Sequence, residues 1–88
     1  MSILKVSIRQ IKAARSMLDW SQVDLAVASG ISEPTIKRLE AGDGELKGRS
    51  STIDAIVGAL TGAGVVFIEQ NGGGPGVRLT SGQYKDNG

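Results

Sequence analysis

Four short segments of this sequence combine a helix-capping serine with apolar side chains at helical spacing. The segments run from Ser7 to Leu18, from Ser21 to Gly30, from Ser32 to Gly42 and from Ser51 to Gly62. A serine can satisfy unpaired N–H groups at the start of a helix, and Gln or Asp three residues later completes a capping box. Such boxes are predicted for Ser7 with Gln10, Ser21 with Asp24 and Ser51 with Asp54. In the third segment, Pro34 suits the first helical turn, where a missing N–H costs nothing. The pattern predicts a mainly α protein.

The pattern changes beyond Gly64. Residues Val65 to Ile68 are β-branched or aromatic, which favours a strand with Val66 and Ile68 on one face and Val65 and Phe67 on the other. A glycine-rich turn over 71–76 and a return strand over 77–80 are expected to follow. We therefore divide the chain into a helical domain (1–63), a C-terminal β extension (64–80) and a flexible tail (81–88).

The absence of cysteine and histidine limits the chemistry of this chain. Disulfides, histidine-based catalysis and nearly all zinc sites are excluded. The glycines of 71–76 resemble a phosphate loop only superficially, because no helix pattern or Lys-Ser/Thr pair follows them. We expect no enzyme, no metal and no cofactor. No apolar run approaches the roughly 18 residues of a membrane span, and the first residues lack a secretory signal, so a cytoplasmic protein without membrane contact is expected.

The segment from Ser21 to Gly42 predicts a helix-turn-helix. Gly30 is free to adopt the left-handed conformation that the turn requires. Ala26 is small, which permits the next helix to cross closely over it. Four apolar side chains are expected to pack in the angle between the two helices: Leu25, Ile31, Ile36 and Leu39.

These positions resemble the phage-repressor-like (XRE/Cro) helix-turn-helix family. The residues that carry the resemblance are Gln22, Leu25, Ala26, Gly30, Ile31, Ser32, Thr35, Ile36, Leu39, Glu40 and Gly42, with Ala14, Arg15, Trp20 and Ser21 before them. The resemblance covers about Ile8 to Leu60. It implies a lambda-repressor-like bundle of four to five short helices, with the C-terminal β-strand or hairpin added to it. It also implies that Arg15 and Glu40 form a partly buried ion pair.

The resemblance further implies binding to double-stranded DNA. With Ile36, Leu39 and Glu40 turned inward, the outward face of the third helix carries the base-contact candidates, which are Glu33, Pro34, Lys37 and Arg38. Phosphate-contact candidates are Gln22, Ser32, Thr35, Lys47 and Arg49. The acidic loop 43–45 departs from a basic pattern, and ordinary solvated charges remain an alternative for the four basic residues. Trp20 is interpreted as a core residue rather than a base-stacking platform.

Three functions remain open. The leading one is a sequence-specific transcriptional regulator, expected to be a repressor that binds a palindromic operator. The second is an antitoxin that binds its own promoter and a toxin partner. The third is a protein–protein adaptor without DNA contacts, which the outward Lys37 and Arg38 argue against.

The two apolar faces of the predicted strand bear on assembly. A single helical layer can cover only one face, so we expect a homodimer through Val65, Val66, Phe67 and Ile68. The alternative is a hairpin within one chain that covers the core of a monomer.

Overall fold

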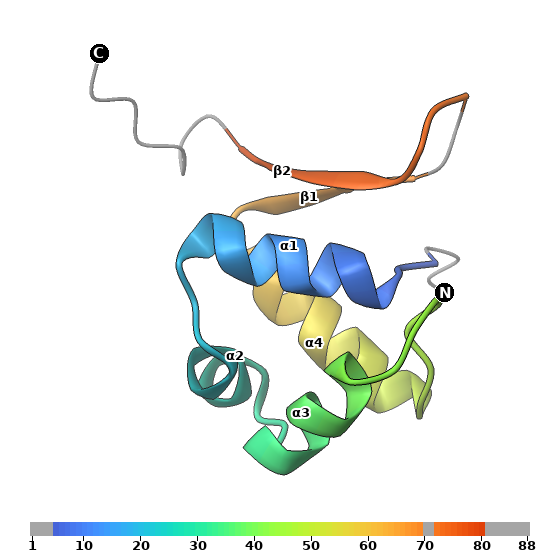
Figure 1. Ribbon diagram of the computed structural model, residues 1–88. Coiled ribbons are helices and arrows are strands. Elements are labelled where there is room, and N and C mark those ends of the chain that lie inside the picture. The colour runs from blue at the N-terminus through green and yellow to red at the C-terminus, as the bar shows by residue number, and fades with distance from the viewer. Residues whose placement is uncertain (1–4, 70–71, 81–88) are drawn as a thin grey trace.

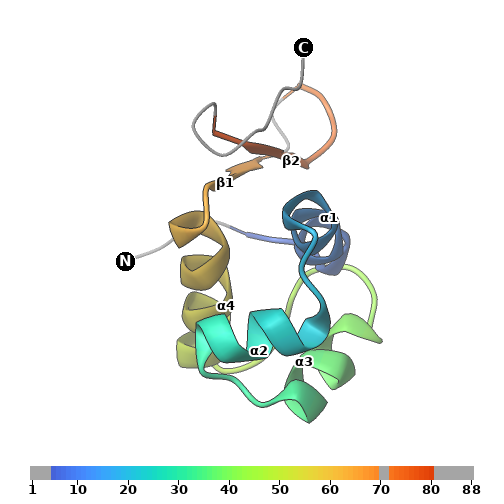
Figure 2. The ribbon, with the colours of Figure 1, turned by 90° about the vertical axis from the view of Figure 1, so that its left-hand side faces the viewer.

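The computed structural model describes residues 5–69 and 72–80, so the predicted flexible tail (81–88) lies outside the described residues. The structure contains four helices and a two-stranded antiparallel sheet within these ranges, as the sequence predicts. The elements are α1 (Ile8–Leu18), α2 (Gln22–Ser29), α3 (Glu33–Glu40), α4 (Ser50–Gly62), β1 (Val65–Ile68) and β2 (Gly76–Leu79). Helices α2 and α3 lie on one side of the molecule and the hairpin lies on the opposite side, with α1 and α4 between them (Figures 1 and 2). No helix of the described residues is long and apolar enough to cross a membrane.

Three of the four predicted helix starts are confirmed. Ser7 with Gln10 and Ser21 with Asp24 form complete capping boxes, and the Ser32 side chain accepts a hydrogen bond from the backbone of Thr35. The predicted box of Ser51 with Asp54 is wrong. Helix α4 begins at Ser50, with Arg49 as the N-cap and no side-chain cap. Ser51 therefore lies inside the first turn, where its side chain is no longer in the capping position.

The core lies where α1, α2, α3 and α4 meet. Its largest fully buried side chains are Ile11, Leu25, Ile36, Ile56 and Leu60. All five lie within the four segments for which the sequence predicts helices with apolar side chains at helical spacing. Trp20 and Leu18 pack against this core at the junction of α1 and α2, which confirms the interpretation of Trp20 as a core residue.

Two further core residues, Val6 and Leu46, lie outside the helices. They are buried because the segment before α1 pairs with the loop after α3. Leu46 N donates to Val6 O at 2.8 Å and Ile8 N donates to Gly44 O at 2.9 Å, forming a short antiparallel bridge. The bridge fixes the middle of the loop between α3 and α4.

The hairpin packs against α1 and α4 through one face only. Val65 pairs with Leu79 and Phe67 with Val77, and these four side chains point toward the helical core. Strand β1 thus finds its partner within the same chain, as the monomeric alternative expected. Val66 and Ile68 lie on the opposite face, where Ile68 is 37% exposed.

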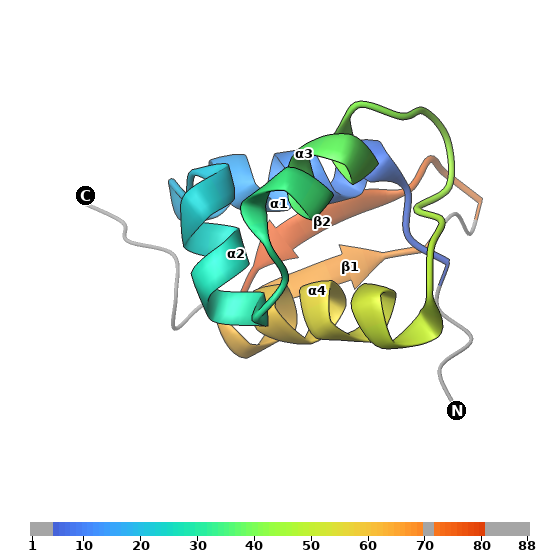
Figure 3. The same cartoon turned by 90° about the horizontal axis from the view of Figure 1, so that it is seen from below.

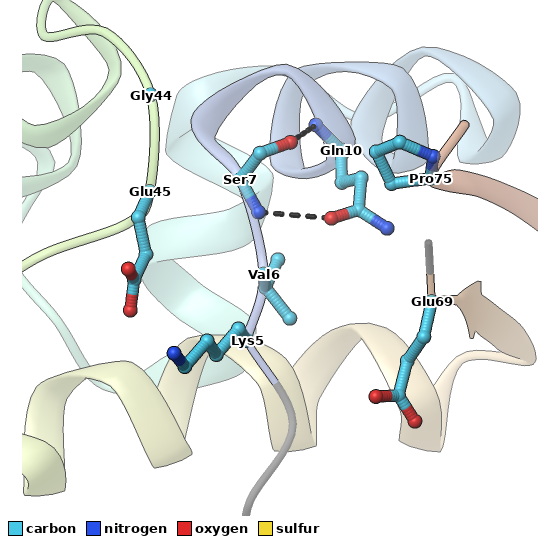
Figure 4. A pocket seen from close by; sticks show the side chains of 8 residues that line it. All are labelled: Lys5, Val6, Ser7, Gln10, Gly44, Glu45, Glu69 and Pro75. Carbon is cyan, nitrogen blue, oxygen red and sulfur yellow. Dashed lines mark hydrogen bonds between the residues drawn. The ribbon is translucent and has the colours of Figure 1, made fainter. Parts of the chain in front are cut away.

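Gln10 connects this hairpin to the first turn of α1. Its side-chain oxygen accepts from Ser7 N at 2.9 Å (Figure 4), and its Nε2 donates to Ile68 O at 3.2 Å and Gly76 O at 2.9 Å. The same residue lines an open pocket of about 570 Å³ together with Lys5, Glu45, Glu69 and Pro75. Gln10 is buried, so a single amide both completes the helix cap and holds the hairpin.

Candidate nucleic-acid interface

Helices α2 and α3 are joined by the tight turn that the sequence predicts. Gly30 adopts a left-handed conformation, with φ of 75°. Leu25 and Ile36 are fully buried in the angle between the helices, and Ile31 and Leu39 pack against the same core. Figure 3 shows α2 and α3 together on the face of the molecule away from the sheet. The segment is therefore a helix-turn-helix with α3 presented at the surface.

The outward face of α3 carries the predicted base-contact candidates. Pro34, Lys37 and Arg38 are exposed, whereas Glu33 is half-buried. Lys37 Nζ lies 3.3 Å from Glu33 Oε2, one helical turn away. Arg38 has no ion-pair partner among the described residues, so its guanidinium is the free positive charge of this face.

The start of α3 holds Ser32 and Thr35 in a local arrangement. Ser32 Oγ accepts from Thr35 N at 3.4 Å and donates to Thr35 Oγ1 at 2.9 Å. Both hydroxyl groups therefore take part in the cap of α3. They lie beside the N-terminus of the helix, whose free N–H groups favour an anion.

An ion pair between α1 and α3 fixes the orientation of the outward face. Arg15 Nε donates to Glu40 Oε2 at 2.8 Å and Arg15 Nη2 donates to Glu40 Oε1 at 2.7 Å, which is a bidentate contact. Arg15 Nη1 also donates to Trp20 O at 3.0 Å. The ion pair that the resemblance implied is confirmed, and it joins α3 to α1 and to the junction before α2.

The environment of this pair stabilises the charged forms of both residues. Burial acts to raise the pKa of Glu40. Hydrogen bonds from Arg15 and Gln22, together with the charges of Arg15 and Lys12, outweigh burial and lower the pKa below its ordinary value. The hydrogen bond to Glu40 raises the pKa of Arg15.

Gln22, the predicted phosphate contact, is part of the same network. Its Nε2 donates to Glu40 Oε1 at 3.0 Å, which links the first residue of α2 to the last residue of α3. This bond occupies one of the two amide hydrogens. The side chain is half-buried, and its position at the N-terminus of α2 suits contact with an anion through the second hydrogen.

Lys47 and Arg49 lie in the loop between α3 and α4. Both are exposed, and Arg49 is the residue that immediately precedes α4. The middle of the loop is held by the bridge between Ser7 and Glu45, and Leu46 beside Lys47 is buried. Its anchored backbone therefore places both basic side chains at the surface.

The exposed residues of this face were predicted from the sequence, but two tertiary contacts that position them were not. The bond between Gln22 and Glu40 had no signal in the local pattern. The pairing of the chain start with the loop 44–46 was also missed, although the apolar residues Val6 and Leu46 were a weak indication of it.

The fold and this exposed helix define a helix-turn-helix protein. Residues 11–50 match the family model described as helix-turn-helix. Neither the comparison with curated proteins nor that with solved structures gives a match. The matched segment runs from within α1 to the first residue of α4, and it is a helix-turn-helix of the phage-repressor-like (XRE/Cro) type. This segment supports a DNA-binding transcriptional regulator.

Proposed function

We propose that this protein is a sequence-specific repressor that binds a palindromic operator as a homodimer. The observation that carries the proposal is the outward face of α3, where Arg38 is exposed and free while Glu40 on the inward face is held by Arg15. A rigidly oriented helix with a free guanidinium suits insertion into the major groove. A repressor needs no further activity, because occupancy of the operator is sufficient.

Arg38 is the principal base contact in this proposal. Its planar guanidinium matches the two acceptors of guanine in the major groove. Lys37 contacts a second guanine or a phosphate, Glu33 accepts from the amino group of cytosine, and Pro34 contacts a thymine methyl. The pair between Lys37 and Glu33 holds both side chains on the same side of α3.

The phosphate contacts surround these base contacts. Gln22, Ser32 and Thr35 lie at the N-termini of α2 and α3, where backbone N–H groups add to the attraction. Lys47 and Arg49 extend the positive surface into the loop before α4. Phosphate contacts fix the position of the helix on the duplex without recognising its sequence.

The second subunit of the homodimer supplies a second α3 helix for the other half-site. One helix of this length contacts only a few base pairs, whereas two copies related by a two-fold axis recognise half-sites about 10 base pairs apart or a multiple of that. Val65 to Ile68 supply the expected interface, and Val66 and Ile68 form the part of it that the chain's own core leaves uncovered.

Selection of bound DNA from a random double-stranded library, followed by sequencing, tests this proposal. The expected product is an enriched palindrome, with the protein sedimenting on it as a dimer. Recovery without any enriched sequence, or sedimentation as a monomer at micromolar concentration both free and on the selected DNA, would contradict the proposal.

A further inference from the structure

The hairpin leaves three surfaces for a second copy: its outer face and the free edges of its two strands. We propose that the second copy binds at the free edge of β1, where the β1 strands of two chains pair antiparallel and form a continuous four-stranded sheet. This inference rests on the proposed dimer and specifies which of the three surfaces it uses.

The backbone of β1 is arranged for such pairing. Thr80 N donates to Gly64 O at 2.8 Å, so Gly64 belongs to a hydrogen-bonded pair of the hairpin. Because hydrogen-bonded and non-hydrogen-bonded pairs alternate along antiparallel strands, Val65 and Phe67 direct their N–H and C=O groups away from β2. No backbone bond joins these groups to another element within the described residues. Among the described residues, the free edge of β1 therefore presents an unfilled row of donors and acceptors.

The two edges differ in composition. Strand β1 consists of four apolar residues with no charge and no proline. Strand β2 is preceded by Pro75 and contains the exposed Arg78. Charged residues and proline are the features that protect a strand edge from pairing. The β2 strand carries this protection and the β1 strand does not.

The position of the sheet relative to α3 excludes the outer face as the dimer surface. The strands lie on the side of the molecule opposite to α3 (Figure 1), and Figure 3 shows their broad faces when viewed from the α3 side. Packing of two outer faces requires a two-fold axis parallel to the sheet. That axis would turn the second copy over and place the two α3 helices at opposite ends of the dimer, where one duplex cannot meet both.

Pairing along an edge has the opposite consequence. The two-fold axis that relates two antiparallel strands of one sheet runs perpendicular to the sheet. In this molecule that direction leads from the hairpin toward α3. Both α3 helices therefore face the same side of the dimer, as binding to one palindrome requires.

The alternation of hydrogen-bonded and non-hydrogen-bonded pairs also limits the register in which two β1 strands can pair. In one register, Val65 exchanges both backbone N–H···O=C hydrogen bonds with Phe67 of the second copy. Val66 then lies directly opposite Val66 of the second copy in a non-hydrogen-bonded pair. Such a pair brings the Cα atoms to about 4.5 Å. A register centred on Phe67 would place Glu69 of the second copy opposite the buried Val65. A register centred on Val65 would pair Phe67 with Ala63, which is the helical C-cap of α4 and not part of a strand. We therefore place the two-fold axis at Val66, which also brings the exposed Ile68 beside the second copy.

Single cysteine variants test this arrangement, because the natural chain contains no cysteine. Val66→Cys should form a disulfide-linked dimer on mild oxidation, since its Cα separation falls within the range for a disulfide. Arg78→Cys is the matched control, because Arg78 is the direct partner of Val66 across the hairpin. Ile68→Cys is the register control, because its counterpart would lie several residues away. We expect most of the Val66→Cys protein, and little of the two controls, to migrate as a dimer without reductant.

The outcomes separate this inference from the proposed function. Cross-linking through Arg78→Cys instead of Val66→Cys would move the interface to the β2 edge. If wild-type protein is a dimer on the selected DNA but Val66→Cys does not cross-link, the dimer does not form at the β1 edge. The repressor proposal would still stand. A cross-linked Val66→Cys dimer would support the edge even if library selection with wild-type protein failed, and that failure would count against the repressor alone.

Discussion

At the scale of single residues, the pair between Arg15 and Glu40 determines how firmly α3 is held. The Glu40 side chain is only 4% exposed and Arg15 is 19% exposed. Removal of one partner leaves a largely buried charge, which costs about 3 to 5 kcal/mol of unfolding free energy. We expect Arg15→Met and Glu40→Leu each to approach this loss and the double variant to lose much less than the sum. A double-mutant cycle on urea unfolding measures the coupling, and a coupling near zero would show that the pair is not a unit.

The lowered pKa of Glu40 gives this pair a pH dependence of definite sign. The folded state favours the carboxylate, so its contribution is fully present above the unfolded pKa of about 4.3 and is lost as pH falls through the lower folded pKa. The unfolding free energy should therefore decrease below about pH 4.3, with a smaller decrease in Glu40→Gln. Glu33→Gln is the control, because Glu33 belongs to the more exposed pair with Lys37. Equal acid dependence of wild type and Glu40→Gln would contradict this account.

At the scale of elements, Gln10 joins the cap of α1 to the hairpin. In Gln10→Glu the oxygen that accepts from Ser7 N is kept, but a carboxylate oxygen replaces the Nε2 that donates to Ile68 O and Gly76 O. We expect a loss of about 1 to 3 kcal/mol and faster hydrogen exchange in β1 and β2, with exchange in α3 little changed.

The control for this prediction is Ser7→Ala. It removes the helix cap and leaves both hairpin contacts of Gln10 in place. It should destabilise α1 without the faster exchange in the strands. Identical exchange profiles for the two variants would show that Gln10 acts through the cap alone.

The elements also show what a sequence can predict in a chain of this kind. The caps at Ser7 and Ser21 depend on residues three positions apart, so the local pattern predicted them correctly. The start of α4 was misplaced because its N-cap is Arg49, whose side chain makes no cap hydrogen bond and therefore leaves no capping signal in the local sequence. The contacts of Gln10 join residues 58 and 66 positions apart, and no local pattern indicates a partner at that distance.

The exposed residues of the candidate site, like most of the helices, could be predicted because they depend on local sequence periodicity. Inward and outward positions of α3 follow from helical periodicity, which placed Lys37 and Arg38 on the exposed side and Glu40 inside. The bond from Gln22 to Glu40 depends on the crossing of α2 and α3. That crossing is a tertiary feature, so the sequence predicted Gln22 as a phosphate contact but not its role in holding α3.

At the scale of the whole molecule, the proposed recognition helix and the proposed dimer surface lie on opposite sides. Helix α3 lies on one side, the hairpin lies on the other, and α1 and α4 connect them (Figure 2). This separation would allow the proposed dimer to form through β1 without covering the face that is proposed to meet DNA. It also means that variants of α3 should change DNA affinity and leave the dimer unchanged.

The most direct test of the central claim is the affinity of Arg38→Ala for the selected operator and for operators changed at single base pairs. We expect Arg38→Ala to lose roughly 5- to 150-fold in affinity for the operator, equivalent to about 1 to 3 kcal/mol, together with the preference at one base pair in each half-site. Arg9→Ala makes the same charge change on α1, beside Pro75 and Val77 of the hairpin, and should bind nearly as wild type. Gln22→Ala should weaken binding to all sequences alike. Unchanged affinity and unchanged base preference in Arg38→Ala would contradict the claim that α3 recognises the operator.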